Sequence, residues 1–404
     1  MSTIRDADLV RTNDYADETG EVRVLDPDGR VLPGARVPDL SDDGFETLYE
    51  AMVEARRFDE RAVSWQRQGR IATYAPMSGQ EGAQVASTLA LTDDDWVFPT
   101  YREHAVRRAA GFELTDVLRG LMGVELPAGR AGGWNVAESD ETGTTVAESD
   151  ETGTTGPTVF PEAVPIATQL PHATGAAMAA RYDDAETVAL AHFGDGATSE
   201  GDFHEGLNFA GVFDAPAVFF CNNNQYAISH PVERQTASAT IAGKADAYGF
   251  AGVQVDGMDP LAVYQVTREA VEKARDPDPD ADELRPTLVE AVMYRFGAHT
   301  TADDPSVYRT DEEVERWKER DPIRRMERFL RERGLLDDEA VDAIEAANRE
   351  TVADLIERAE AYVPDVDEWF ENAYETPTPR VREQQDYLRD LRERHGDDAL
   401  VRDE

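Results

Sequence analysis

Two continuous apolar runs of strand length, with a segment of helical periodicity between them, constrain the fold of this chain more than any other feature. The runs are Thr187–Phe193 and Pro216–Cys221, and residues 198–213 between them carry apolar side chains at helical spacing. Strands that are apolar on both faces and joined by a helix are typical of a βαβ unit in a buried parallel sheet. The sequence therefore predicts an α/β fold with a mainly parallel sheet flanked by helices.

The remaining pattern divides the chain into three parts. Residues 1–44 are polar and turn-rich and predict an N-terminal arm, residues 45–310 hold the α/β domain, and residues 311–404 are predicted to be a helical C-terminal region. The further elements that we expect are a short hairpin at residues 22–29, a helix that begins after Ser41, a helix at 78–91 with Ser78 and Glu81 as a capping box, strands at 95–99, 251–256 and 287–294, and helices at 260–275, 366–374 and 380–395.

A tandem repeat interrupts the α/β domain. The sequence Val-Ala-Glu-Ser-Asp-Glu-Thr-Gly-Thr-Thr occurs at residues 136–145 and again at 146–155. Two copies are too few for a repeat architecture. Because the segment is polar, acidic and contains glycine, we expect a solvated surface loop.

Acidic side chains dominate the composition. The chain has 83 Asp and Glu against 40 Lys and Arg, a formal net charge of −43, and only three of the basic side chains are lysines. Nucleic acids and anionic membrane surfaces repel such a chain, so we expect neither as a partner. At about 1 M salt the Debye length falls to roughly 3 Å and self-repulsion is screened. The composition therefore favours a protein adapted to molar salt over a merely acidic cytosolic one.

Three further features predict a cytoplasmic location. Cys221 is the only cysteine, so no internal disulfide can form, which fits a reducing compartment. The first 17 residues are acidic and lack the apolar core of a signal peptide. Nor does any apolar run approach the roughly 20 residues that span a bilayer.

Polar residues follow both strands of the βαβ unit. Gly194-Asp195-Gly196 comes directly after the first strand, and Asn223-Asn224 follows the second. Parallel strands present their carboxyl ends at one sheet edge, where α/β proteins bind ligands. Two hard oxygen ligands there suit Mg²⁺, which takes few protein ligands together with phosphate oxygens. Glycine lets the backbone approach a phosphate closely, and the N-terminus of the following helix favours anions.

A Gly-Asp-Gly followed by Asn-Asn after the next strand is the signature of thiamine diphosphate enzymes, and the likeness continues over most of the chain. Residues 45–110, 160–230 and 285–330 resemble the alpha subunit of the thiamine diphosphate-dependent E1 component of 2-oxo acid dehydrogenase complexes, most closely the pyruvate and branched-chain members. The stretches that carry the resemblance are Gly69-Arg70-Ile71, Gly79-Gln80-Glu81, Tyr101-Arg102-Glu103, the run from Gly201 to Ala210, Tyr226-Ala227-Ile228-Ser229, and the run from His299 to Asp304.

The resemblance implies roles for individual residues. The side chains of Asp195 and Asn224 and the backbone carbonyl of Tyr226 match the Mg²⁺ ligands. His299 matches a catalytic histidine on a mobile loop that closes on the diphosphate and faces the reacting centre. The other residues implied to bind the cofactor are Tyr101 and Arg102 beside the diphosphate, Gly196 and Ala197 through their backbone, and Ile166 under the bent cofactor. Arg102 suits its role because a guanidinium binds phosphate oxygens bidentately.

The sequence departs from the family in two places that bear on function. Ala163 and Val164 stand where branched-chain relatives have two serines, one of them a potassium ligand, so a potassium site at Thr168 and Gln169 stays open. Trp134-Asn135 replaces the usual Met-His pair.

The implied activity is oxidative decarboxylation of a 2-oxo acid, with pyruvate favoured, followed by acyl transfer to lipoyl groups of an E2 core. The glutamate that activates the cofactor belongs to the beta subunit in this family, so the chain is expected to work in an α₂β₂ heterotetramer. Branched-chain 2-oxo acids and acetoin remain alternative substrates. A non-catalytic scaffold is a further alternative, against which the retention of Asp195, Asn224, Arg102 and His299 argues.

Other residues near the motifs have simpler interpretations. His192, His204 and Cys221 are expected to pack within the strands and the helix, whereas His104 lies close enough to Arg102 to leave its role open. By the same resemblance, Thr300 stands where mitochondrial relatives carry a serine whose phosphorylation inactivates the enzyme.

Overall fold

The computed structural model describes residues 20–123, 156–281, 283–362, 370, 374 and 376–396. The tandem repeat, Trp134-Asn135 and most of the helix predicted at 366–374 lie outside the described residues.

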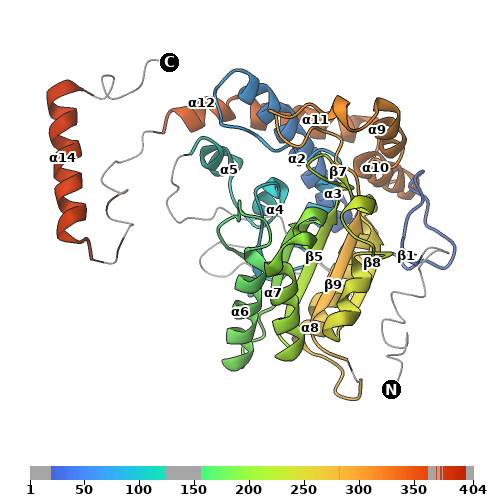
Figure 1. The fold of residues 1–404 in the computed structure, drawn as a ribbon. Helices are drawn as coiled ribbons and strands as arrows, with labels where there is room; N and C mark the ends of the chain where they lie inside the picture. Colours follow the sequence, from blue (N-terminus) through green and yellow to red (C-terminus); the bar gives the residue numbers. More distant parts are fainter. Residues whose placement is uncertain are drawn as a thin grey trace.

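A seven-stranded parallel sheet forms the centre of the molecule (Figure 1). Its strands, in spatial order, are β1 (Glu21–Val22), β8 (Ala251–Asp256), β9 (Thr287–Val292), β5 (Ala217–Asn223), β4 (Ala189–Gly194), β2 (Trp96–Phe98) and β3 (Thr158–Val159). Every pairing between these neighbours is parallel. The α/β fold with a mainly parallel sheet is therefore confirmed.

Both faces of the sheet are covered, which explains why its central strands carry apolar side chains on both sides. In β4, Leu190 belongs to the core on one face, whereas Ala191 and Phe193 belong to the core on the other. On the first face pack α2 (Asp42–Arg67), α3 (Glu81–Leu89) and α8 (Pro260–Arg275). On the second face pack α6 (Gln169–Tyr182) and α7 (Gly201–Val212). This burial on both sides is the usual environment of parallel strands.

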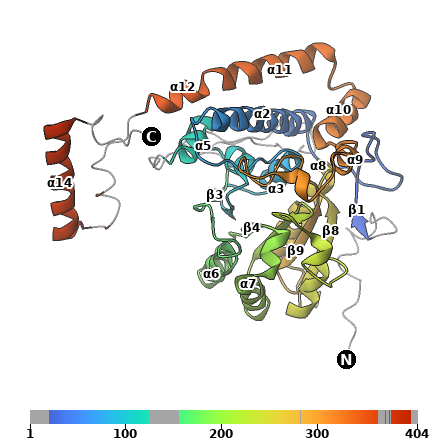
Figure 2. The ribbon, with the colours of Figure 1, turned by 45° about the horizontal axis from the view of Figure 1, so that its top comes forward.

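The C-terminal helices lie outside the sheet domain (Figure 2). They are α9 (Asp311–Lys318), α10 (Pro322–Arg333), α11 (Asp338–Ala353) and α12 (Leu355–Glu360), followed by α14 (Pro379–His395), which stands apart from the body. Shorter helices α4 (His104–Ala109) and α5 (Leu114–Leu121) lie beside α3 and α12. Helices α10 and α11 pack against α2, and α12 packs against α5. Within the described part of the chain, no helix is both long and apolar enough to cross a bilayer.

The N-terminal segment is tied to the sheet rather than standing free. Strand β1 pairs with β8, and an antiparallel bridge between Leu25 and Val31 closes the predicted hairpin. The Asp259 carboxylate accepts hydrogen bonds from the backbone N–H groups of Val24 (2.7 Å) and Leu25 (2.6 Å).

The capping box predicted at Ser78 is wrong. Helix α3 begins at Glu81 with Gln80 as its N-cap, and the Ser78 hydroxyl instead donates to the buried Asp59 carboxylate. Gly79 explains the late start, because its φ of +92° lies outside the helical region. The helix predicted at 198–213 also starts later, at Gly201, after a 3₁₀ turn over Asp195–Ser199.

Candidate active site

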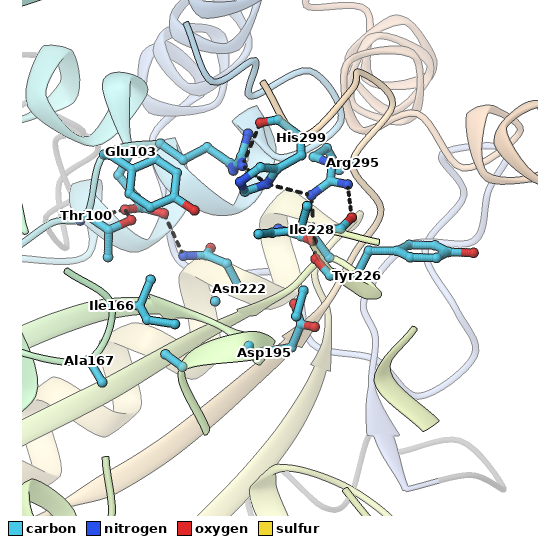
Figure 3. Close-up of a pocket in the computed structure, with 17 residues that line it drawn as sticks. Thr100, Glu103, Ile166, Ala167, Asp195, Asn222, Tyr226, Ile228, Arg295 and His299 are labelled. Carbon is cyan, nitrogen blue, oxygen red and sulfur yellow. Dashed lines mark hydrogen bonds between the residues drawn. The ribbon is translucent and has the colours of Figure 1, made fainter. Parts of the chain in front are cut away.

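A cavity of about 200 Å³ lies at the carboxyl ends of β4 and β5 (Figure 3). All nine site residues predicted from the sequence line it, namely Tyr101, Arg102, Ile166, Asp195, Gly196, Ala197, Asn224, Tyr226 and His299. They come from segments spread over about 200 positions, and the parallel topology brings them to one sheet edge.

Asp195 and Asn224 meet because β4 and β5 are neighbours in register, with Gly194 opposite Asn222. Burial raises the pKa of the Asp195 carboxyl to about 6. One of its oxygens, Oδ2, accepts a hydrogen bond from Gln235 Nε2 at 2.6 Å. The Oδ1 atom of Asn224 is buried and has no hydrogen-bond partner in the described part of the chain. Such an unpartnered buried oxygen is unfavourable unless a ligand satisfies it.

Tyr226 turns its side chain away from the cavity and its backbone toward it. The phenol donates to Glu313 Oε1 at 2.9 Å, and Figure 3 shows the ring directed outward. The Tyr226 carbonyl accepts a long contact from Arg295 Nη1 at 3.5 Å. Its backbone oxygen is therefore available on the cavity side.

Gly196 lines one wall of the cavity, at a position where a side chain would not fit. A Cβ added there would lie 2.8 Å from the Cβ of Ala227, closer than carbon atoms approach in proteins. The absence of a side chain lets the peptide groups after β4 face the cavity, just before α7 begins at Gly201.

Two buried arginines face the same cavity. Arg102 is 4% exposed and Arg295 is 1% exposed, and neither forms an ion pair with an acidic side chain of the described residues. Arg102 donates to the carbonyls of Pro76 (2.7 Å) and His299 (3.0 Å), and Arg295 donates to that of Ile228 (3.0 Å). Burial, then the Arg102 charge, lowers the pKa of Arg295 to about 10. Two buried guanidinium groups without an ion-pair partner among the described residues make the cavity a favourable site for an anion.

His299 lies between the two arginines and is held neutral by burial and by their charges. Burial, followed by the charges of Arg102 and Arg295, lowers its pKa to about 4. Its Nδ1 lies 3.0 Å from Arg102 Nη2. A guanidinium can only donate, so Nδ1 accepts and the ring proton is carried on Nε2.

The loop that carries His299 is anchored by polar side chains. Asp303 Oδ2 accepts from the His299 backbone N–H at 2.8 Å and from the Tyr308 hydroxyl at 2.6 Å. Burial opposes ionisation of Asp303, but these hydrogen bonds and the nearby Arg295 charge lower its pKa. Thr301 links the loop to the segment before α3, since its backbone N–H donates to Tyr74 O at 2.8 Å.

Comparisons with known proteins agree with this geometry. Residues 49–366 match the family model described as "Dehydrogenase E1 component". The chain belongs to the dehydrogenase E1 component family. It is 42% identical over 370 residues to "3-methyl-2-oxobutanoate dehydrogenase subunit alpha" of Mycobacterium tuberculosis, covering 91% of this chain and 93% of the relative. It is 38% identical over 378 residues to "Pyruvate dehydrogenase E1 component subunit alpha" of Staphylococcus aureus, covering 92% and 93%. The chain is thus an E1 alpha subunit of a 2-oxo acid dehydrogenase.

Backbone strain gathers around the cavity of this E1 subunit. Among the described residues, five other than glycine have positive φ; Ala167 (+71°) and Ile228 (+56°) line the cavity, and Gln225 (+78°) adjoins Asn224. A β-branched residue such as Ile228 rarely adopts this conformation. The Ile228 carbonyl accepts from Arg295, so the strained turn points an acceptor at a buried cation.

Sequence reasoning missed several residues that build the E1 site. Arg295 follows β9, and the rule that ligands gather after parallel strands could have found it, as it found Asp195. Buried Glu103 and Asn222, which hydrogen-bond at 3.2 Å, also line the cavity, and burial raises the pKa of Glu103. Gln80, which contacts Asn224, left no local signal.

The remaining side chains mostly behave as expected. Cys221 and His192 are buried in their strands, and burial lowers the pKa of His192 to about 3. His204 does not pack inside as expected: it is exposed and contacts the Tyr248 hydroxyl. His104 is buried against the Tyr74 ring, with centroids 4.9 Å apart, and burial lowers its pKa to about 3. The Thr168 hydroxyl donates to the Pro165 carbonyl.

Proposed function

We propose that the cavity binds thiamine diphosphate together with Mg²⁺. The observation that carries the proposal is that one cavity brings together two buried arginines, which form no ion pair among the described residues, and the oxygen atoms of Asp195 and Asn224. No three His, Cys, Asp or Glu side chains of the described residues converge on a possible metal site. A hard cation that takes two side-chain oxygens, a backbone carbonyl and phosphate oxygens suits this donor set.

Within this proposal, different walls of the cavity bind the Mg²⁺, the diphosphate and the rings of the cofactor. Asp195, Asn224 and the Tyr226 carbonyl hold the metal, which neutralises part of the diphosphate charge. The diphosphate is bound by Arg102, Arg295 and His299, with Tyr101 beside them and the peptide groups of Gly196 and Ala197 opposite. Ile166, which is 40% exposed, offers an apolar surface for the cofactor to rest on.

We propose that the chain then catalyses oxidative decarboxylation of a 2-oxo acid and transfers the acyl group to lipoyl groups of an E2 core. The bound cofactor supplies the nucleophile and the electron sink. The chain orients the cofactor, shields it from water and holds a proton on His299 Nε2, which is available for hydrogen bonding at the reacting centre. A beta subunit completes the site in an α₂β₂ assembly, as the names of the relatives' subunits suggest.

Pyruvate is the substrate that we propose to test first, with 3-methyl-2-oxobutanoate as the second candidate. The second candidate is kept because of the 42% identity to a 3-methyl-2-oxobutanoate dehydrogenase subunit, against 38% for the pyruvate enzyme. The chain, purified with and without its beta subunit, is assayed for decarboxylation of each acid with an artificial electron acceptor. Activity with neither acid, in a preparation that binds thiamine diphosphate, would contradict the proposal.

The net charge of −43 leads us to propose that the enzyme works in the cytoplasm at high salt. Assays are therefore run at about 2 M KCl, where the Debye length is only a few ångströms, and repeated at about 0.1 M, where it is ~10 Å. We expect dissociation or unfolding at the lower salt concentration. Retained assembly and secondary structure there, measured by light scattering and circular dichroism, would contradict adaptation to salt.

A further inference from the structure

The amide of Asn224 is held by a side chain from a distant part of the sequence. Gln80 Oε1 accepts a hydrogen bond from Asn224 Nδ2 at 3.2 Å, although 144 residues separate the two. Gln80 is fully buried and Asn224 is 6% exposed. With Nδ2 directed at Gln80, the Asn224 Oδ1 atom is directed elsewhere and has no partner in the described part of the chain. The contact with Gln80 therefore decides which end of this amide is left for a ligand.

Gln80 occupies the N-cap position of α3, where a side chain usually accepts a hydrogen bond from a backbone N–H of the first helical turn. Its side chain, however, makes no capping hydrogen bond. Glu81 Oε2 accepts at 2.8 Å from the N–H of Gly79, which lies before the helix, and so fixes the preceding turn. The Gln80 side chain contacts Asn224 instead of capping α3.

The turn that carries Gln80 is fixed from two sides. The Asp59 carboxylate accepts from the Met77 N–H at 2.7 Å, and Ser78 O accepts from the Phe296 N–H at 2.9 Å. Gly79 permits this close packing, because a Cβ there would lie 2.3 Å from Tyr294 O. The acceptor that Gln80 offers to Asn224 is accordingly held by a rigid frame rather than by a mobile chain.

We infer that Gln80 is a positioning residue that turns the carbonyl of Asn224 toward the metal, an inference that rests on the proposed function. The two ends of an asparagine amide are similar in size, but only the oxygen can coordinate a cation. A buried acceptor behind Nδ2 selects the coordinating orientation before the metal arrives. Residues that orient metal ligands in this way commonly change metal affinity by about 10- to 100-fold when they are replaced.

Two substitutions at Gln80 separate this role from simple packing. Gln80→Met keeps the length of the side chain and removes the acceptor, so Asn224 is free to turn its NH₂ toward the metal. Gln80→Glu, in its ionised form, keeps an acceptor and has no donor, so at a pH where this carboxyl is ionised it holds Asn224 only in the orientation seen here. Gln265→Met is the matched control, because Gln265 is another buried glutamine, on α8 packed against α3, away from the cavity.

The measurement is binding of Mn²⁺, a spectroscopic substitute for Mg²⁺, by electron paramagnetic resonance in the presence of thiamine diphosphate. Each variant is prepared with the beta subunit at the salt concentration in which the parent is assembled. We expect Gln80→Met to weaken Mn²⁺ binding by about 10- to 100-fold. Gln80→Glu and Gln265→Met should stay within about threefold of the parent, and thermal unfolding of all metal-free variants should be similar.

Two outcomes would overturn the inference. The first is parental Mn²⁺ affinity in Gln80→Met. The second is a Gln80→Glu variant as weak as Gln80→Met with unchanged folding, because the opposite amide orientation, or a loss of packing, would then account for the effect. Failure of the proposed function is a separate result, since the parent itself would then bind neither Mn²⁺ nor thiamine diphosphate.

Discussion

The two sides of the cavity are built in different ways. On one side, Asp195 and Asn224 leave the ends of neighbouring strands in a sheet that is buried on both faces. On the other side, Arg295 and His299 lie in a segment without regular structure after β9, held mainly by hydrogen bonds between side chains and backbone. The sheet and the core hold the first side in place, and polar contacts hold the second.

This difference implies different stabilities for the two sides. Opening β4 or β5 would expose a large apolar core, whereas releasing the segment 297–310 would break mainly polar contacts, those of His299 to Arg102, Tyr308 to Arg295, Thr301 to Tyr74 and Arg309 to the carbonyls before the segment. Elements with few buried apolar contacts open at low free energy. We therefore expect the strand side to behave as a rigid metal platform and the loop side as a lid that the anionic ligand helps to hold.

The largest effect is expected on the strand side. Asp195→Ala or Asn224→Ala removes a side-chain oxygen from the proposed metal site, and should weaken Mg²⁺-dependent thiamine diphosphate binding by about 100-fold or more. Isothermal titration with and without Mg²⁺ measures the effect. Asp202→Ala in the first turn of α7 is the control for a lost carboxylate. Unchanged cofactor affinity in either variant would remove the metal assignment.

The next largest effect is expected when Arg295, which contacts the loop side of the cavity, is replaced. Arg295→Met deletes contacts to Ile228 O and Tyr308, and we expect about tenfold weaker diphosphate binding and faster hydrogen exchange in residues 297–310. Exchange in β4 and β5 should not change. Arg285→Met, which removes carbonyl contacts at the opposite end of β9, is the matched control. If exchange rose equally in the strands, the two sides would not be independent.

A smaller effect is expected from charge on the loop itself. Thr300 adjoins His299, so a negative charge there would lie close to the bound diphosphate and keep the loop open. Thr300→Glu should lower turnover of the assembled enzyme about fivefold, because a carboxylate carries part of the charge that a phosphate would bring. Thr300→Gln, of the same size without the charge, and Thr300→Ser should be nearly silent. Parental turnover in the glutamate variant would mean that the loop does not gate this site.

The smallest effect concerns pH. Because the pKa of His299 falls from its ordinary 6.5 to about 4 in the closed loop, the open loop binds more protons between these values. Closure is therefore fully stable above pH 6.5 and weakens as the pH falls from 6.5 toward 4. Asp303, whose pKa is lowered from 3.8, adds to the loss only below that range. Hydrogen exchange of the loop, corrected for its intrinsic pH dependence, should show this window in the parent and lose it in His299→Gln.

Much of the fold follows from the sequence because its signals are local. The continuous apolar runs required strands covered on both faces, and the strand at 251–256 and the helix at 260–275 have the predicted bounds. The polar residues after two neighbouring strands also had to meet, since parallel strands end at one edge. Asp195 and Asn224 could thus be brought together on physical grounds, whereas Arg102, Ile166 and His299 were named only through resemblance to a family.

Only the tertiary structure decided how these residues are held. Gln80 meets Asn224 across 144 residues, Glu313 meets Tyr226 across 87, and Arg102 meets His299 across 197. No local pattern encodes such contacts, because each depends on where a loop or a helix end lies after the core has packed. Periodicity and strand order determine the platform of this E1 subunit. The orientation of its ligand-facing atoms is set by polar contacts between segments that only folding brings together.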